Sequence, residues 1–315
     1  MTKFTAAVIQ AASVAGDKAA TVAKTIGLIA EARQRGADLA VFPEAFIGGY
    51  PKGADFHIFI GARTPEGRQE FASYAANAIL VPGPETAAIG DAARKANLYV
   101  TIGVIERDGG TLYCTALYFG PDGALLGKHR KLMPTAAERL CWGFGDGSTM
   151  DTVPTPWGPM GAVICWENYM PLLRMAMYGR GIAIYCAPTA DDRDSWASTM
   201  QHIALEGRCF VLSSCQYLTR ADFPTDMRNQ ISDDGDRVLM RGGSMIIDPL
   251  GRILAGPDFS GETILTAELD TDDIPRAQFD FDAVGHYARP DIFNLVVNER
   301  PMPAVSFSRA EPEAT

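Results

Sequence analysis

The sequence contains little histidine, no paired cysteine motif and no long apolar run. Four histidines are scattered over 315 residues without a cluster, so we expect no metal site. The six cysteines form no Cys-x-x-Cys pair and no disulfide spacing, which in a chain of this length predicts reduced thiols and a cytoplasmic location. Because no apolar run approaches ~18 residues, we expect no membrane span.

Positive charge is also scarce. The chain carries 28 Lys and Arg against 38 Asp and Glu, a net charge of −10. A nucleic acid or an anionic membrane would need a basic face, so neither is expected as a partner. The hydrophobic content of 47% and the charged content of 21% are typical of a globular protein with a substantial core.

Strands and helices alternate along the chain, with hairpins inserted, which predicts an α/β protein with a mixed sheet covered by helices. The first helix should begin after Asp17 and bury Val22, Ile26, Ile29 and Ala30. No linker or internal repeat divides the chain, so we expect one domain over residues 1–280. The Pro-rich residues 281–315 form a C-terminal extension that should lie on the surface or on a neighbouring subunit. Besides a short strand that leads into Cys165, ten strands are expected, over residues 4–10, 39–42, 99–106, 112–119, 125–131, 182–186, 209–215, 243–248, 252–255 and 263–269.

One stretch has the composition of a nucleophile site. In Gly161-Ala-Val-Ile-Cys165-Trp-Glu-Asn-Tyr-Met-Pro171, small and β-branched residues lead into a cysteine, followed by a possible helix cap and a proline suited to a first helical turn. This predicts a buried strand, a sharp turn and a new helix, with the Cys165 sulfur at the corner. The positive end of that helix would lower the thiol pKa. The alternative is an inert, packed cysteine.

Two further charged residues lie at the ends of predicted strands. Glu44 follows one buried strand and Lys131 ends another. Sites in α/β sheets collect beyond the carboxyl ends of strands, so Glu44, Lys131 and Cys165 could converge at one rim. There the carboxylate could accept the thiol proton and the ammonium could face a developing negative charge. Taken singly, each charge is better explained as a solvated strand end.

These residues lie in three blocks, which resemble, in the same order, the signature blocks of the carbon–nitrogen hydrolase (nitrilase) superfamily. The blocks are Phe42-Pro-Glu-Ala-Phe46, His129-Arg-Lys-Leu-Met-Pro-Thr135 and Cys165-Trp-Glu-Asn-Tyr169.

Further segments are similar to the true nitrilase branch, and in places to plant and arylacetonitrile-type nitrilases. They are Lys131-Leu-Met-Pro-Thr-Ala-Ala-Glu-Arg139, Trp142-Gly-Phe-Gly-Asp-Gly147, Ala187-Pro-Thr-Ala190, His202-Ile-Ala-Leu-Glu-Gly-Arg-Cys-Phe-Val211 and Gly285-His-Tyr-Ala-Arg-Pro-Asp291.

The resemblance implies a four-layer α-β-β-α sandwich that hydrolyses organic nitriles to carboxylic acids and ammonia. Carried over by position, Glu44 is the general base, Lys131 the cationic stabiliser, Cys165 the nucleophile and Glu138 an accessory carboxylate. No metal or organic cofactor is implied. The resemblance also implies a homo-oligomer built from dimers that pair across the helices near the nucleophile and stack into spirals.

Aromatic residues in the motif loops are candidates for the substrate pocket. We predict that Tyr50, Trp142, Trp166 and, more weakly, Pro188 form its walls, although an aromatic residue is more often part of the core. The acidic run Asp191, Asp192 and Asp194 is interpreted as capping of the following helix rather than a cation site. His129 is expected to be satisfied by backbone, and His202 to pair with Glu206 one helical turn later.

Three alternatives remain open from the sequence. An amidase or N-carbamoyl hydrolase would use the same glutamate, lysine and cysteine. A papain-like hydrolase would pair Cys165 with His202 or His286. A non-enzymatic scaffold on the same fold would leave the thiol unreactive.

Overall fold

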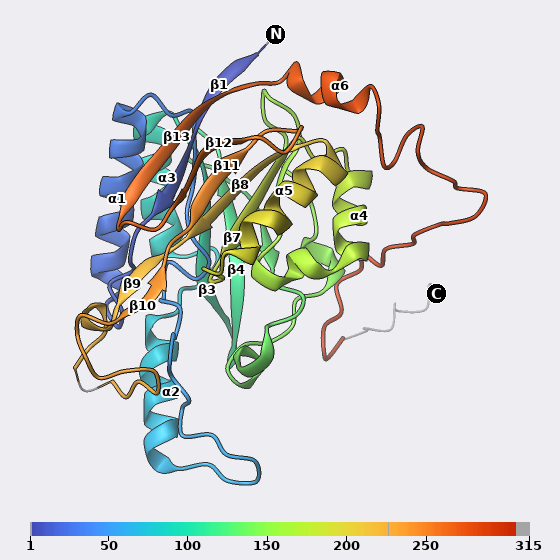
Figure 1. Cartoon of the computed structure of the whole chain (residues 1–315). Helices are drawn as coiled ribbons and strands as arrows, with labels where there is room; N and C mark the ends of the chain where they lie inside the picture. The colour runs from blue at the N-terminus through green and yellow to red at the C-terminus, as the bar shows by residue number, and fades with distance from the viewer. Residues whose placement is uncertain (1, 226, 307–315) are drawn as a thin grey trace, which may run out of the picture.

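Two β-sheets lie face to face, and a pair of helices covers the outer face of each (Figure 1). This computed structural model describes residues 2–225 and 227–306. The arrangement is the α-β-β-α sandwich that the family resemblance implies. It differs from the single mixed sheet that strand alternation alone suggests.

The first sheet has six strands in the order β13-β1-β2-β3-β4-β5. The neighbours β1, β2 and β3 run parallel, and the remaining pairs are antiparallel. The strands are β1 (Lys3–Gln10), β2 (Leu39–Val41), β3 (Tyr99–Asp108), β4 (Thr111–Phe119), β5 (Leu125–Arg130) and β13 (Thr263–Asp270).

The second sheet has five strands in the order β12-β11-β8-β7-β6, with β6, β7 and β8 parallel. Its strands are β6 (Met160–Ala162), β7 (Ile184–Thr189), β8 (Phe210–Cys215), β11 (Ser244–Ile247) and β12 (Ile253–Asp258). A separate antiparallel pair, β9 (Tyr217–Thr219) and β10 (Val238–Arg241), is not among the strands expected from the sequence.

Four helices form the outer layers. The first sheet is covered by α1 (Lys18–Gln34) and α3 (Pro84–Ala96), and the second by α4 (Pro171–Gly179) and α5 (Ser195–Gly207). Two helices lie outside the layers: α2 (Pro65–Asn77) projects from one end of the molecule, and the short α6 (Asp273–Gln278) follows β13 (Figure 1).

Side-chain alternation along the strands builds the layered core. On β1, Val8 faces the other sheet and packs in the same cluster as Ile184 and Leu212, whereas Ala7 and Ile9 face α1 and α3. This is the two-residue period of an extended strand that is buried on both faces. The strand β1 is therefore buried on both of its faces.

The predicted buried face of α1 is partly wrong. Asp17 caps the helix as expected, accepting from the Ala20 amide at 2.9 Å. However, Ile26 and Ala30 are exposed, and the buried side chains include Thr21 and Thr25. The Thr25 hydroxyl donates to the Thr21 carbonyl at 2.8 Å, so the helix satisfies a buried threonine internally and can turn it toward the sheet.

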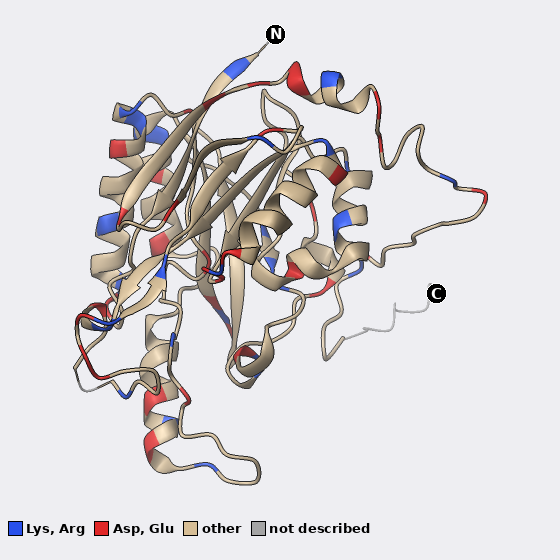
Figure 2. Cartoon of the chain, viewed as in Figure 1, with Lys and Arg blue, Asp and Glu red and all other residues tan. Residues whose placement is uncertain are grey.

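The chain beyond α6 contains no helix or strand as far as residue 306, and it loops away from α4 before returning to the body (Figure 1). It returns beside residues 146–147, where the Met302 amide donates to Asp146 at 2.8 Å. Charged residues of both signs are interspersed along α1, α6 and the loops (Figure 2). Within the described residues, no helix combines the length and apolarity needed to cross a bilayer.

Candidate active site

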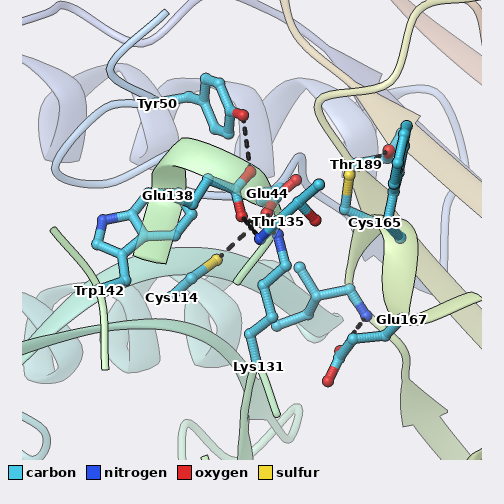
Figure 3. Close-up of polar contacts among 12 residues, drawn as sticks. Glu44, Tyr50, Cys114, Lys131, Thr135, Glu138, Trp142, Cys165, Glu167 and Thr189 are labelled. Atoms are coloured by element: carbon cyan, nitrogen blue, oxygen red, sulfur yellow. Dashed lines mark hydrogen bonds and ion pairs between the residues drawn. The ribbon is translucent and has the colours of Figure 1, made fainter. Parts of the chain in front are cut away.

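The three predicted catalytic positions follow the carboxyl ends of strands in both sheets. Glu44 comes three residues after β2, Lys131 directly follows β5, and Cys165 comes three residues after β6. Figure 3 shows Cys165 on one side, Tyr50 and Glu138 on the other, and Glu44 with Lys131 between them. The structure therefore brings together residues that are far apart in the chain.

Gly103 on β3 makes room for the Glu44 turn. The Gly103 amide donates to the Pro43 carbonyl at 3.1 Å. A Cβ atom at Gly103 would lie 2.7 Å from Glu44 Cα, closer than side chains tolerate. Only glycine allows this close approach of backbone to backbone. Sequence reasoning missed Gly103, because nothing in its local pattern indicates what packs against it.

Lys131 bridges two glutamates. Its Nζ lies 2.6 Å from Glu44 Oε1 and 2.7 Å from Glu138 Oε2, and its side chain has no exposed surface. Burial lowers the pKa of Lys131, but the Glu44 carboxylate and its neighbours raise it by more, so the pKa lies well above its usual value. The lysine is thus a fixed cation.

Glu138 is held by further donors. Tyr50 donates its hydroxyl to Oε1 at 2.7 Å, and the Thr135 amide donates to Oε2 at 2.6 Å. The latter contact belongs to a capping box at the start of the short 3-10 helix Ala136–Leu140. The sequence block containing Lys131 therefore also supplies, seven residues later, one of the lysine's two anchors.

The two carboxylate oxygens of Glu44 differ in their hydrogen bonding. Oε1 accepts from Lys131 and, at 3.5 Å, from the Cys114 thiol. Oε2 is buried and has no hydrogen-bond partner among the described residues. Burial raises the pKa of Glu44, Lys131 opposes this, and the net pKa lies above the usual value. A buried carboxylate oxygen that accepts no hydrogen bond is a suitable proton acceptor.

Cys165 occupies a constrained backbone position. It begins the 3-10 helix Cys165–Tyr169 with φ +52°, a left-handed conformation that is uncommon for residues other than glycine. The Asn168 side chain donates to the Cys165 carbonyl at 2.8 Å and to the Val163 carbonyl at 2.9 Å. These two hydrogen bonds hold the turn that carries the sulfur.

The expected lowering of the thiol pKa by a helix dipole is wrong. The α-helix α4 begins only at Pro171, and a single 3-10 turn separates it from Cys165. Burial raises the thiol pKa, Glu44 raises it further, and Lys131 only partly offsets both. Burial and the nearby Glu44 carboxylate thus favour the protonated form of the thiol.

His129 and Glu167 form a second buried pair beside the site. His129 Nε2 lies 3.1 Å from Glu167 Oε2, and its Nδ1 lies 3.2 Å from the Thr149 carbonyl. The predicted hydrogen bond to the backbone is present at Nδ1, whereas the contact of Nε2 with Glu167 was not predicted. Glu167 also accepts from the amides of Leu132 and Ile164, at 2.6 and 2.8 Å. This pair ties the segment after Lys131 to the segment before Cys165.

A cavity of about 200 Å³ opens at Cys165. Two of the predicted pocket walls, Tyr50 and Trp166, line it; Trp142 and Pro188 are not among the lining residues. Trp142 is buried behind Lys131 and donates to the Tyr74 hydroxyl at 3.1 Å, and Pro188 is buried within β7. The complete lining is Tyr50, Lys52, Thr135, Glu138, Cys165, Trp166, Ala190, Asp191, Asp192 and Arg193.

The acidic run after β7 does not cap α5, contrary to expectation. Asp194 occupies the N-cap position in a helical conformation without a side-chain cap, and Arg241 lies 2.6 Å from its carboxylate. Asp191 instead accepts the Trp166 indole N–H at 2.9 Å and forms a bidentate ion pair with Arg193. The Arg193 guanidinium lies 4.8 Å from the Trp166 ring centre. Sequence reasoning missed this wall because capping is the commoner role of such a run.

Other titratable clusters lie away from Cys165. His202 is exposed on α5, 3.6 Å from Glu206 as expected, and His286 belongs to the exposed C-terminal segment. Neither of these two histidines lines the Cys165 cavity, so neither is placed to act as the base of a papain-like hydrolase. The one group of potential metal ligands found in the described part of the chain is Asp55, His57 and Glu70. The Arg228 guanidinium contacts its histidine at 3.0 Å.

Comparison with known proteins places the chain in a family. The carbon–nitrogen hydrolase family model matches residues 5–278, so the chain belongs to that family. It is 77% identical over 305 residues to a protein named aliphatic nitrilase from Sinorhizobium fredii (strain HH103), covering 97% of this chain and 99% of that relative. It is 53% identical over 307 residues to nitrilase 2 of Arabidopsis thaliana, covering 96% and 91% of the two chains.

Solved structures support the fold. The C. elegans NitFhit protein superimposes with a TM-score of 0.73 at 19% identity, covering 96% of this chain and 69% of that one. A carbon–nitrogen hydrolase from Helicobacter pylori G27 gives a TM-score of 0.70 at 20% identity, covering 88% and 92%.

Proposed function

We propose that this protein is a nitrilase that hydrolyses organic nitriles to carboxylic acids and ammonia, with Cys165 as nucleophile. The observation that carries the proposal is the buried Lys131 bridging Glu44 and Glu138 beside the Cys165 cavity. High identity over nearly the whole chain to relatives named nitrilases supports the choice of nitriles as substrates.

The proposed reaction begins with proton transfer from the Cys165 thiol to Glu44. The sulfur electron pair forms a bond to the nitrile carbon, and the nitrogen takes up a proton, giving a thioimidate. A first water adds to that carbon, and loss of ammonia leaves a thioester. A second water releases the carboxylic acid and restores the thiol, so one nitrile and two waters give one acid and one ammonia.

The neighbouring groups have separate roles in this scheme. Lys131 and the backbone N–H of Trp166 stabilise the negative charge that develops on the nitrile nitrogen and later on the oxyanion. Glu138 orients Lys131 and the incoming water. Tyr50 and Trp166, together with Asp191 and Arg193, form the walls against which the substrate lies.

The principal alternative is an amidase or N-carbamoyl hydrolase using the same residues. Ammonia release from a nitrile and from its matching amide, assayed side by side, separates the two. Rapid turnover of the amide with an inert nitrile would reject the nitrilase proposal. Cys165→Ala and Lys131→Ala should release no measurable ammonia, whereas Cys209→Ala, at a buried cysteine beside β8, is the matched control that should stay active.

We also propose a homo-oligomer built from dimers that pair across α4, with the C-terminal extension lying over this interface. Exposed apolar side chains support it, including Leu172 on α4, 68% exposed, and Phe293 in the extension, 78% exposed. A cytoplasmic location is supported by the six free cysteines, five of them buried.

A further inference from the structure

Thr189 is a buried residue in direct contact with the sulfur of Cys165. It ends β7, its exposed fraction is 1%, and its hydroxyl donates to Cys165 Sγ at 3.3 Å (Figure 3). Thr189 lies on β7, and Cys165 follows the neighbouring parallel strand β6. Ala162 pairs with Cys186, and Cys165 and Thr189 each lie three residues further on. The turn after β6 thus brings the sulfur beside the end of β7.

A second hydrogen bond reaches the same hydroxyl. The Asp191 amide donates to Thr189 Oγ1 at 2.9 Å. The proton of the hydroxyl does not point toward that amide, because the oxygen accepts from it. Once Cys165 has lost its own proton, the sulfur can only accept, so the hydroxyl then donates to it. Accepting a hydrogen bond also polarises the O–H group and makes it a better donor.

Thr189 differs from the other groups around the Cys165 sulfur because its side chain does not titrate. The charged or titratable groups that act on the Cys165 thiol, or on which it acts, are Glu44, Tyr50, Lys131, Glu138, Arg193 and Cys215. Two glutamates among them disfavour a thiolate, and Lys131 has its Nζ committed to both. A hydroxyl that contacts the sulfur directly favours the thiolate without adding charge to the site.

We propose that Thr189 is a catalytic residue that aims the Cys165 sulfur at the substrate and stabilises the thiolate formed during attack. This rests on the proposed function. The S–H bond breaks and its proton passes to Glu44, while the sulfur pair forms the S–C bond. The π pair of the nitrile moves to nitrogen, which takes that proton from Glu44. Thr189 keeps its own proton throughout, so its contribution is a hydrogen bond that strengthens as the sulfur gains charge.

The test compares Thr189→Val, which removes the hydroxyl at nearly constant volume, with Thr189→Ser, which retains it. Loss of a hydrogen bond to a charged group predicts a kcat about 10- to 100-fold lower in the Val variant. We expect KM to change by less than about 2-fold, because the hydroxyl contacts the sulfur rather than the substrate. The Ser variant should recover most of the lost kcat.

A second readout does not depend on nitrile turnover. Iodoacetamide alkylation of Cys165, measured against pH with the Cys165→Ala protein as blank, should require higher pH in the Val variant. Thr101→Val is the matched control. Thr101 is a buried threonine on β3 that contacts the sulfur atoms of Met160 and Cys186, each at 3.7 Å, and its loss should change neither kcat nor the alkylation profile.

Equal kcat and equal alkylation profiles in the Val and Ser variants would overturn the proposal. So would a loss of activity that lies wholly in KM. If Thr189→Val does not fold, Thr189→Ala serves in its place with the same criteria. Failure of the proposed function would give a different result, namely nitrile hydrolysis that persists in Cys165→Ala.

Discussion

At the residue scale, the hydrogen bond from Tyr50 to Glu138 gives a specific test of how the site is held. We expect Tyr50→Phe to keep the ring that lines the cavity but to leave Glu138 Oε1 without its 2.7 Å donor. Because Glu138 in turn anchors Lys131, kcat should fall about 10-fold, the effect of losing one hydrogen bond to a carboxylate. Steady-state kinetics on one nitrile measures this.

The matched control is Tyr178→Phe. Tyr178 donates to Glu206 at 2.7 Å, the same chemistry at the same distance, but between α4 and α5 and away from Cys165. Its kcat should stay at the wild-type value. Equal kinetics in the two variants would show that Tyr50 is only a wall of the cavity.

The residues of the site differ in how readily the sequence alone identifies them. Glu44, Lys131 and Cys165 are recognisable because each lies in a short local block at a strand end. The donors Tyr50 and Thr189 belong to no such pattern around their partners, and their contacts join segments 88 and 24 residues apart. The direction of the Cys165 pKa shift was predicted wrongly for a related reason. The local helix signal was visible, but the burial that outweighs it is a property of the assembled sheets.

At the element scale, the segment after β7 controls the mouth of the cavity. Arg193 forms an ion pair with the buried Asp191 and a cation–π contact with the Trp166 ring. Arg193→Gln therefore removes both interactions. We expect the ratio of kcat/KM for an arylacetonitrile to that for a short aliphatic nitrile to rise about 2- to 5-fold, comparable to the worth of an exposed cation–π contact. Competition assays with both nitriles measure this ratio.

Arg252→Gln is the control for this variant. Arg252 is likewise an exposed arginine paired with a nearly inaccessible carboxylate, Asp248, on the turn between β11 and β12. It should leave the ratio unchanged. A ratio that moves equally in both variants, or in neither, would contradict a role for Arg193 in selecting substrates by size.

Helices and strands are predicted correctly from the sequence where an apolar run is followed by a residue that favours a turn. The strands and helices of the two sheets were largely expected, because their apolar runs end at glycine, proline or asparagine, as α3 does at Asn97 in a left-handed conformation. The pair β9 and β10 was missed because it lies in a polar, acidic stretch. Its pairing depends on contacts between residues about 20 positions apart.

At the scale of the whole molecule, the buried pair of His129 and Glu167 couples stability to pH. Burial lowers the pKa of His129, but Glu167 raises it by more, so the folded-state pKa lies above the usual value. The stabilisation is therefore fully present below the unfolded-state pKa of about 6.5 and is lost as pH rises through the folded-state pKa. We expect the difference in unfolding free energy between wild type and His129→Gln to shrink across that range.

Denaturant unfolding of both proteins at a series of pH values measures this difference. Its slope should approach about 1.4 kcal/mol per pH unit between the two pKa values. Glu167→Gln keeps the side-chain size but removes the charge, so the same comparison made in that background should lose the slope. A slope that survives without Glu167 would assign the pH dependence to another group.

The proposed dimer interface is the largest-scale feature that a single substitution can test. Leu172 and Met175 are exposed apolar residues on α4, beside a groove of about 710 Å³ that Met175 lines together with residues of the C-terminal segment. In a twofold dimer across α4, a charge at 172 would face its own copy, so Leu172→Asp should weaken dimerisation at least about 100-fold.

Ile26→Asp places the same charge on α1, which covers the other sheet, and should not change the assembly (Figure 1). Sedimentation velocity distinguishes the outcomes. An unchanged assembly in Leu172→Asp would mean that the exposed apolar face of α4 has another purpose, because an interface of identical copies cannot accommodate two opposed carboxylates at its centre without loss of affinity.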